Sequence, residues 1–506
     1  MHLATNKILQ IGARKSDLAR LQAYLVGTAL KEKTFQDVQY TFRESLGDKN
    51  LNDPLWKMPE KGVFTQDFYQ DLISGKLDCV VHSWKDLPVD SSPETEIIAT
   101  LPRADQRDLI LFKKTSLHKK NIQIYSSSPR REHNLKPFLK SYLPWQIDTV
   151  DFCSVRGNVQ TRVRKLIEDP TTDGLILAKA ALDRLLSHDS DEFVTTKNQL
   201  LEHLNLCQWM VLPLSENPNA AAQGALAIEI RKDRSDLKKL FAHINCSQTA
   251  EAVQKERKIF SAYGGGCHQK IGIAVLQRPY GEIIFSKGLT PSGEELNTVQ
   301  LIRSQNSPPT SLIKKELNFK TSRTALNFDL PPKTQAVWVA RTDGQFLETL
   351  NSFRGYIWAA GLQTWKKLSD LGLWVHGCAE GLGEKENPQI ETLTQTQNIE
   401  WTYLSHSMGH QVTANNTIAT YDLDIEVIET TFDPELMSQQ KYFFYWKSES
   451  QFNAALKKYP DILHQYHACG PGKTWQILSK QISTEKLFIY LNSTDWLKES
   501  LNDRTT

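Results

Sequence analysis

The sequence predicts an α/β protein, because short apolar strands alternate with stretches of helical periodicity. "KILQIG" is a short apolar run, and the leucines after its "ARKS" turn recur at helical spacing, with Ser16 in position to cap the helix. "FTQDFYQDLISGKLDCVVHS" has the same parts in the opposite order, since a helical face and a glycine suited to a helix end precede a strand. The class therefore rests on repeated pairs of one strand and one helix.

A third pair is "IQIYSSSPRREHNLKPFL". Its strand runs into serines that can cap a helix, and Pro129 stands where a first helical residue is favourable. The beginning of such a helix directs free backbone N–H groups outward, so it suits an anion.

Size and composition limit the classes of protein to which the chain can belong. The chain has 506 residues, of which 40% are hydrophobic, so several cores and about three or four domains are expected. A formal charge of +2 predicts no general affinity for nucleic acid or membrane. The seven cysteines are scattered without a C-x-x-C pair, which argues against disulfides and structural zinc. The sequence shows neither a signal-peptide apolar region nor a run of ~20 apolar residues, so we expect a cytoplasmic protein.

Positive charge gathers in one part of the chain. Residues 121–166 contain eight Lys or Arg and three acidic residues, and five of the eight are arginines, which bind carboxylates and phosphates through two parallel hydrogen bonds. A solvated helix face is the alternative interpretation of such a run. Several arginines stand near predicted strand ends or helix starts, where α/β folds place ligands, namely Arg14, Arg130, Arg131, Arg156 and Arg162. This placement favours a polyanionic substrate.

The stretch "DCVVHSWKDLP" carries two charges to the end of an apolar strand. Val80 and Val81 favour burial, whereas Lys85 and Asp86 do not, so these two side chains are expected at the rim of a core, where functional groups tend to lie. We interpret His82 as a hydrogen-bonded strand histidine rather than a catalyst.

Residues 6–305 resemble hydroxymethylbilane synthase, also called porphobilinogen deaminase. The resemblance rests on eight motifs that occur in the order of that family: "IGARKSDLARLQA", "KGVFTQDFYQDLISGKLDCVVHSWKDLP", "RADQRD", "SSSPRRE", "VRGNVQTRVRKL", "DGLILAKAALDRL", "QGALAIEIR" and "GGGCHQKIG". It implies two α/β lobes of the periplasmic-binding-protein kind, crossed twice by the chain, and a small α/β domain that carries a cysteine. The expected boundaries are 1–103 with 206–231 for the first lobe, 104–205 for the second and 232–305 for the third domain.

The resemblance also implies a reaction. The family joins four porphobilinogens head to tail with loss of ammonia at each step and releases the linear tetrapyrrole by hydrolysis, without a metal. The growing chain is primed on a dipyrromethane cofactor held by a thioether, and the family motif for that cysteine matches Gly265, Gly266 and Cys267, with Lys270 in place of the usual proline. We expect a monomer that binds porphobilinogen and neither nucleic acid nor membrane.

Roles for individual residues follow from the same motifs. Asp86 is the expected catalytic acid/base, because a fixed carboxylate stabilises the positive charge that develops on the pyrrole and can accept and return a proton. Lys85 is expected to pair with a substrate carboxylate and to assist. Every pyrrole carries an acetate and a propionate, so many carboxylates need cationic partners. The residues expected to bind cofactor are Cys267, Arg130, Arg131, Lys85, Ser126 and Arg184. Those expected to bind substrate are Arg14, Ser16, Arg156, Arg162, Lys61, Gln223 and Gly224.

Two departures from the family pattern stand out. "LSENPNAAA", residues 214–222, lengthens a connection that is shorter in the family, and "AKAAL" replaces the usual Ala-Gly-Leu ending. Deaminase activity remains the expected function.

Beyond residue 305 the composition changes. "SQNSPPTS" and "DLPPKT" predict a linker over 306–332, and "AVWVAR" begins a new apolar strand. Residues 333–506 contain a weak repeat of strand, small-residue turn, helix and strand, which resembles the two lobes of uroporphyrinogen-III synthase. The positions expected to bind carboxylates there are Thr364, Ser448, Ser450 and Thr474.

Other classes of function stay open at this point. The chain could be the same deaminase with a degenerate, non-catalytic C-terminal module, or a solute-binding protein without catalysis, since that fold is shared. Nucleic-acid binding by residues 121–166 lacks a supporting aromatic stacking pattern.

Overall fold

The computed structural model describes residues 8–44, 66–89, 92–266, 268–305, 307–344, 346–408, 416–429 and 432–499. The chain divides into two compact units: unit 1 comprises 1–277, 284–299 and 389–396, and unit 2 comprises 278–283, 300–388 and 397–506. Within the described residues, every helix is too short or too polar to cross a bilayer.

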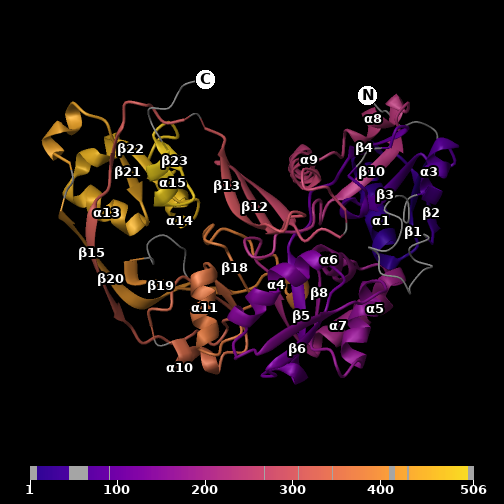
Figure 1. Ribbon diagram of the computed structural model, residues 1–506, viewed down its shortest axis with the longest axis horizontal. Coiled ribbons are helices and arrows are strands. Elements are labelled where there is room, and N and C mark those ends of the chain that lie inside the picture. The colour runs from indigo at the N-terminus through magenta and orange to yellow at the C-terminus, as the bar shows by residue number, and fades with distance from the viewer. Residues whose placement is uncertain are drawn as a thin grey trace. The chain divides into compact units, whose positions relative to one another are not determined.

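The first lobe of unit 1 is built on a five-stranded sheet in the order β2-β1-β3-β10-β4. β1 is parallel to β2 and β3, whereas β10 is antiparallel to β3 and β4, and Figure 1 shows β10 as a magenta strand among indigo ones. As predicted, Ser16 caps the first helix by accepting a hydrogen bond from the Ala19 N–H at 3.4 Å. The elements are β1 (Leu9–Arg14), α1 (Asp17–Thr34), β2 (Val38–Arg43), α3 (Gln66–Ile73), β3 (Cys79–Ser83), the 3-10 turn η2 (Trp84–Asp86), β4 (Thr95–Ala99), β10 (Leu226–Arg231) and α8 (Ser235–Phe241).

The second lobe repeats this plan, with a five-stranded sheet in the order β7-β6-β8-β5-β9. β6 is parallel to β7 and β8, and β5 is antiparallel to β8 and β9. Pro129 is the first residue of α4, as its fixed φ predicts. The elements are β5 (Asp108–Lys113), β6 (Asn121–Tyr125), α4 (Pro129–Tyr142), β7 (Thr149–Cys153), α5 (Val159–Glu168), β8 (Gly174–Ala178), α6 (Lys179–Ser187), α7 (Val194–Asn205) and β9 (Cys207–Val211).

The chain crosses between the two lobes twice, and the position of the second crossing differs from the expected boundary. We expected residues from 206 to belong to the first lobe, but β9 pairs with β5 in the sheet of the second lobe, from Lys113↔Cys207 to Leu109↔Val211. The crossing therefore follows Val211. "CQWMV" is an apolar run that would suit either sheet, so its partner is decided by the fold and not by its own pattern.

The third part, most of which belongs to unit 1, packs α9 (Ser247–Ser261) on a three-stranded sheet of β11 (Gly272–Arg278), β12 (Gly281–Leu289) and β13 (Glu295–Arg303). Ala252 of α9 and Ile273 and Ile284 of the sheet share one core. The loop from α9 to β11 contains Gly264, Gly265 and Gly266 with φ of 92°, 62° and 94°, a left-handed conformation that favours glycine. The three glycines that precede Cys267 in the sequence therefore adopt a backbone conformation that other residues rarely adopt.

Unit 2 contains two sheets, which have the orders β15-β20-β19-β16-β17-β18 and β14-β21-β22-β23. The strands of the second are parallel throughout, and β16 to β19 of the first are parallel as well. The predicted repeat corresponds to β17, α11, β18 in one sheet and β21, α13, β22, α14 in the other. The strands are β14 (Ile313–Lys315), β15 (Asn318–Ala325), β16 (Ala336–Val339), β17 (Tyr356–Ala359), β18 (Gly377–Cys378), β19 (Trp401–His406), β20 (Thr417–Glu429), β21 (Tyr442–Trp446), β22 (Tyr466–Cys469) and β23 (Leu487–Ile489). Among the described residues of unit 2, the α-helices are α10 (Phe346–Asn351), α11 (Leu362–Asp370), α13 (Glu449–Lys458), α14 (Lys473–Leu478) and α15 (Ser493–Lys498), while the short helix α12 (Glu391–Thr394) belongs to unit 1.

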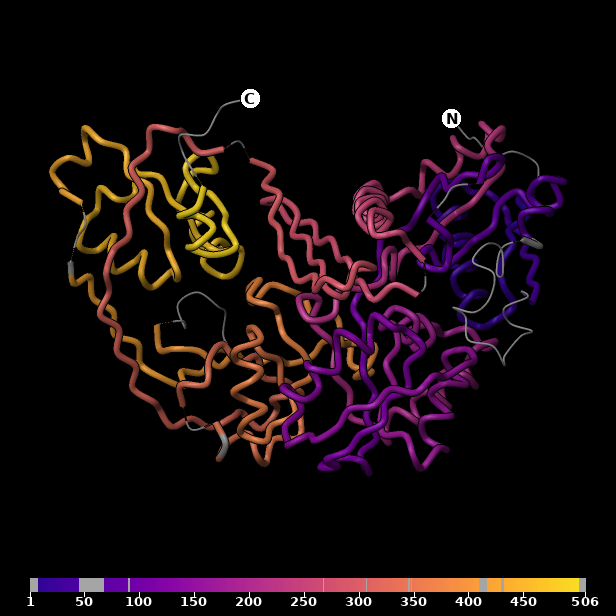
Figure 2. Tube along the Cα trace, in the orientation of Figure 1, coloured from indigo at the N-terminus to yellow at the C-terminus, as the bar shows by residue number. Residues whose placement is uncertain are grey.

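The stretch expected to be a linker, 306–332, is in part regular structure. It contains β14, which pairs with β21, and β15, which pairs antiparallel with β20 from Phe319↔Val427 to Ala325↔Tyr421, as Figure 2 lets the reader follow by colour. Most side chains of "NFKTSRTA" are exposed, so this strand lacks the apolar alternation that marks strands in a sequence. The pair lies at one edge of the six-stranded sheet, and the chain passes between the two sheets before β15 and after β20.

Candidate active site

Lys85 and Asp86 lie in η2, directly after the buried strand β3. His82 on that strand is buried and its Nε2 lies 2.9 Å from Glu229 Oε2 on β10, which confirms the interpretation of a hydrogen-bonded strand histidine. The end of β3 is held to α1 because Gln22 Nε2 donates to Ser83 Oγ at 2.9 Å. Trp84 is buried, whereas the Asp86 side chain is exposed. A buried strand and a buried tryptophan thus hold an exposed carboxylate in place.

Asp86 shares a small cavity of about 80 Å³ with Arg14 and Ser16. Arg14 is the last residue of β1 and Ser16 precedes α1, so both stand at the carboxyl end of a parallel strand next to β3. Ligands of α/β folds bind at this edge of the sheet. The structure therefore brings three of the expected site residues together in the first lobe.

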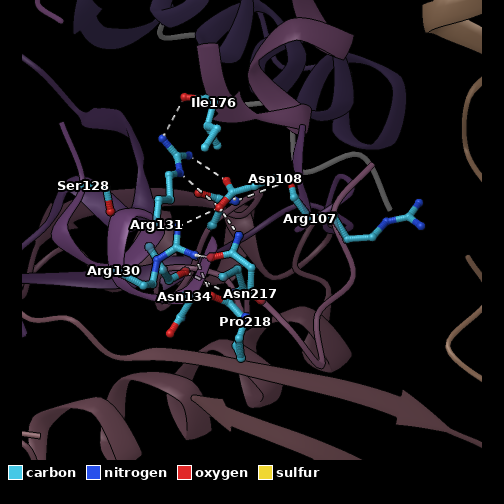
Figure 3. Close-up of polar contacts among 12 residues, drawn as sticks. Arg107, Asp108, Ser128, Arg130, Arg131, Asn134, Ile176, Asn217 and Pro218 are labelled. Carbon is cyan, nitrogen blue, oxygen red and sulfur yellow. Dashed lines mark hydrogen bonds and ion pairs between the residues drawn. The ribbon is translucent and has the colours of Figure 1, made fainter. Parts of the chain in front are cut away.

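Arg130 and Arg131 begin α4 in the second lobe and are both buried. Figure 3 shows them around Asp108, the first residue of β5. Arg131 donates from Nε and Nη2 to the two carboxylate oxygens at 3.0 and 2.6 Å, and Arg130 Nη2 donates to Oδ2 at 2.8 Å. Burial alone would raise the pKa of Asp108, but Arg131 and Arg130 outweigh it and hold that pKa well below its usual range. Two guanidiniums thus share one carboxylate, which leaves the cluster with an excess of positive charge.

Gln223 and Gly224 connect this cluster to Lys85. Gln223 is buried; its Nε2 donates to Asp108 Oδ1 at 2.9 Å, and its Oε1 accepts from Lys85 Nζ at 3.2 Å. Gly224 has φ +88°, and a Cβ there would lie 2.5 Å from the Ala104 carbonyl oxygen, so the position requires glycine. Its own carbonyl accepts from Arg184 Nη2 at 2.7 Å. The second crossing therefore links the lobes at the site itself.

The electrostatics of Arg162 on α5 indicate that the two lobes face one site. Burial, together with Arg131, Arg156 and Arg14, lowers the pKa of Arg162 to about 10, and Asp86 acts in the opposite sense. Burial likewise lowers the pKa of Arg184 to about 10. It also lowers the pKa of Lys85 to about 8; the negative charge of Asp86 raises that pKa, and the positive charge of Arg131 lowers it further. Cations that lower one another's pKa values are short of anions, so the site suits a ligand with carboxylates.

Other expected residues fall into three groups. Ser126 is buried at the end of β6, and its Oγ accepts from the Ser128 N–H at 3.3 Å. Cys267 and Lys61 lie outside the described residues. In the C-terminal half, Thr364 Oγ1 donates to the Ala340 carbonyl at 3.0 Å and Ser448 caps α13, while Ser450 and Thr474 are half-buried in α13 and α14.

Two residues that organise the site, Asp108 and Asn217, were not predicted from the sequence. Asp108 stands inside the motif "RADQRD", and the signal that could have singled it out is a charged residue opening the fully buried strand "DLILFK". Asn217, in the lengthened connection, donates from Nδ2 to Asp108 Oδ2 at 2.8 Å. Its sequence context, "SENPN", looks like an ordinary surface loop, so the sequence held no signal for this contact.

The fold and this cluster define a two-lobed α/β protein with a cationic site where its lobes meet. The family model for the porphobilinogen deaminase, dipyromethane cofactor binding domain matches residues 9–239. The porphobilinogen deaminase of Syntrophomonas wolfei is 35% identical over 289 residues, which cover 56% of this chain and 85% of that protein. That of Limosilactobacillus reuteri is 33% identical and covers 60% and 92%. A probable porphobilinogen deaminase of Saccharolobus islandicus is 32% identical and covers 64% and 99%.

The chain belongs to the porphobilinogen deaminase family, and its first half carries the dipyrromethane-binding domain. Among solved structures, the methionine-binding protein MetQ covers 49% of this chain and 94% of its own at 10% identity with a TM-score of 0.27, so the family assignment rests on the sequence relatives.

The residues present fit a dipyrromethane group. Such a group carries four carboxylates, and the cluster offers Arg130, Arg131 and Lys85 against the carboxylates of Asp108 and Asp86, an excess of one positive charge. Both the excess charge and its burial match what a carboxylate-rich ligand needs.

Proposed function

We propose that residues 6–305 are a hydroxymethylbilane synthase, which condenses four porphobilinogens into the linear tetrapyrrole hydroxymethylbilane and releases ammonia. The observation that carries the proposal is a hydrogen-bonded link between the lobes: Gln223 accepts from Lys85, the neighbour of Asp86, at 3.2 Å and donates to Asp108 of the arginine cluster at 2.9 Å. A solute-binding protein without catalysis would need the cations but would have no use for a carboxylate held among them.

The cationic residues bind carboxylates, and Asp86 stabilises charge and transfers a proton. Arg14, Arg156 and Arg162 bind the acetate and propionate groups of the substrate, and Arg130, Arg131 and Lys85 hold the dipyrromethane group, which supplies the pyrrole to which the first substrate is joined. Asp86 lies at the pyrrole nitrogen of the substrate, where its carboxylate stabilises the cation left when ammonia departs. The same carboxylate accepts the proton that leaves the α-carbon of the pyrrole joined to the substrate, as that pyrrole regains its aromaticity.

The decisive experiment is the intact mass of the purified protein. It should exceed the sequence mass by one dipyrromethane, and acidic Ehrlich's reagent should give the colour of that group. Cys267→Ser should remove the added mass, the colour and the activity, whereas Cys246→Ser, in a half-buried cysteine outside the family motif, should keep all three. Active wild-type protein without added mass would overturn the proposal.

The lowered pKa of Lys85 gives this function a specific pH dependence. Its pKa of about 8 lies below the usual value, so the ammonium is charged below pH 8 and loses its charge as the pH rises further. We expect the rate at which protein prepared without dipyrromethane takes up that group to fall above pH 8, because uncharged Lys85 no longer attracts its carboxylates. Lys85→Arg keeps its charge and should lack this alkaline limb, with circular dichroism as the control for unfolding. An identical limb in both proteins would contradict the assignment.

For the C-terminal half we propose a second activity, that of a uroporphyrinogen-III synthase acting on the hydroxymethylbilane made by the same chain. Its support is the architecture of unit 2, in which the chain passes twice between two mainly parallel sheets, before the antiparallel strand β15 and after β20, together with the internal repeat. The two activities are consecutive, and tethering raises the local concentration of an intermediate that closes spontaneously.

The isomer of uroporphyrinogen formed from porphobilinogen by the full-length protein tests this second activity. Type III product supports it. Exclusively type I product, which is what spontaneous closure yields, would leave the C-terminal half as a non-catalytic module. Because either isomer requires hydroxymethylbilane, the isomer ratio tests only the second activity, and a complete lack of uroporphyrinogen would count against the deaminase instead.

A further inference from the structure

Residues 214–222, the lengthened connection between β9 and β10, are built into the interior. Connections normally run over the surface, yet Leu214, Asn217, Asn219 and Ala222 are each at most 2% exposed. Two of these four are asparagines, whose buried amides need partners. The connection is therefore part of the site's construction.

Asn217 joins the two charged partners of the arginine cluster (Figure 3). Its Oδ1 accepts from Arg130 Nη1 at 2.9 Å, and its Nδ2 donates to Asp108 Oδ2 at 2.8 Å. The neighbouring Pro218 carbonyl accepts from the same Arg130 Nη1 at 2.7 Å. Because Nη1 has two protons, the connection accounts for both of them and fixes the plane of the guanidinium.

The rest of the connection is anchored so that Asn217 has little freedom. The buried Glu256 of α9 accepts from the Ala222 N–H at 2.8 Å and from Asn219 Nδ2 at 3.3 Å, and it is itself held by both terminal nitrogens of Arg103 at 2.8 Å. The Asn219 carbonyl accepts from the Ile273 N–H of β11 at 3.0 Å. The three parts of unit 1 thus hold one short segment.

An uncharged amide meets the needs of position 217. A guanidinium only donates and a carboxylate only accepts, so the residue between them must both accept and donate. An ionised carboxylate there would face Asp108 without a proton and would cancel the excess positive charge of the cluster. An alkyl group would leave both partners short of a hydrogen bond.

We propose that Asn217 is a positioning residue that orients Arg130 and preserves the positive charge of the cluster for the carboxylates of the dipyrromethane group. The inference rests on the proposed deaminase function and adds to it a determinant from the lengthened connection. Asn217 acts through Arg130 and Asp108, and it does not need to touch the ligand.

The test compares Asn217→Asp and Asn217→Ala with Glu216→Gln, a control in the same connection whose side chain contacts Lys287 at 2.6 Å and not the cluster. The readouts are the fraction of polypeptide carrying dipyrromethane by intact mass, the melting temperature, and kcat/KM per loaded molecule. We expect Asn217→Asp to load less than about a tenth as much as wild type, because it neutralises the cluster. Asn217→Ala keeps the charge and should load, with kcat/KM reduced about fivefold through a less ordered Arg130. Glu216→Gln should match wild type.

A pH profile separates this role from a merely structural one. In the Asn217→Asp variant a protonated carboxyl would again accept from Arg130 and donate to Asp108, so kcat/KM of its loaded fraction should recover toward wild type as the pH is lowered, while Asn217→Ala shows no such recovery. Full loading of Asn217→Asp at pH 8 would overturn the proposal. If that variant does not fold, a kcat/KM of Asn217→Ala within twofold of Glu216→Gln would overturn it instead. Wild-type protein without dipyrromethane would refute the deaminase function itself, which is a different outcome.

Discussion

Replacing Asp86 by asparagine is expected to reduce turnover of porphobilinogen by a factor of about 100 or more. Asparagine keeps the shape of the side chain but removes its negative charge and its basicity, and a hundredfold loss corresponds to about 2.7 kcal/mol of transition-state stabilisation. Asp86 is exposed at the end of η2, so the substitution leaves the core of the lobe unchanged. Cofactor loading should persist, since the cations that hold the cofactor remain.

Single-turnover kinetics and intact mass measure the two effects separately. Asp37→Asn is a suitable control, because Asp37 is an exposed carboxylate of the same lobe that lies 3.9 Å from Lys31 and outside the site. Turnover of Asp86→Asn within a few-fold of Asp37→Asn would move the acid/base role to another group. Loss of the added mass together with turnover would instead place Asp86 in cofactor assembly.

Arg131→Leu is expected to abolish cofactor loading and also to destabilise unit 1 by about 3–5 kcal/mol. The substitution removes two hydrogen bonds to Asp108 and one to the Ile176 carbonyl, and it leaves a fully buried carboxylate with one guanidinium instead of two. Removing one partner of a buried ion pair costs far more than losing a surface charge. Urea unfolding gives the stability change, and intact mass gives the loading.

Two further variants separate stability from binding. Arg164→Leu makes the same change on the exposed surface of α5, where Arg164 lies 3.8 Å from Glu168, and should shift stability by no more than about 0.5 kcal/mol. The pair Arg131→Leu with Asp108→Asn removes both charges and should regain part of the stability without regaining the cofactor. Equal stability of Arg131→Leu and Arg164→Leu would show that Arg131 has no structural role. Recovery of loading in the double variant would show that it has no binding role.

Local patterns in the sequence were sufficient for the elements that carry the site. Alternation of apolar strands with helical stretches predicted the α/β class, and Ser16 and Pro129 predicted where α1 and α4 begin. These predictions hold because capping and the fixed φ of proline act over a few neighbouring residues. The motif "HSWKD" likewise predicted that Lys85 and Asp86 would follow a buried strand.

Contacts between residues far apart in the chain could not be predicted from such local patterns. The sequence predicted that Arg130 and Arg131 bind carboxylates, but it could not indicate that one carboxylate is already present as Asp108, 22 residues before Arg130, or that Asn217 lies 87 residues after it. It also assigned β9 to the wrong lobe and treated β15 as linker. In each case the residue's role is decided by a hydrogen bond or a strand pairing with a distant segment. The energy of that contact depends on which segment the fold places next to the residue.

The sequence by itself thus determined the class of the fold, the family and the kinds of side chain at the site. Only the tertiary structure decided how the charges of the site are shared, because the net charge of a buried cluster depends on which distant groups the fold brings within hydrogen-bonding distance. Burial then makes that sharing matter, since the pKa values of Lys85, Asp108 and Arg162 depart from their usual values only once water is excluded and their neighbours are in place.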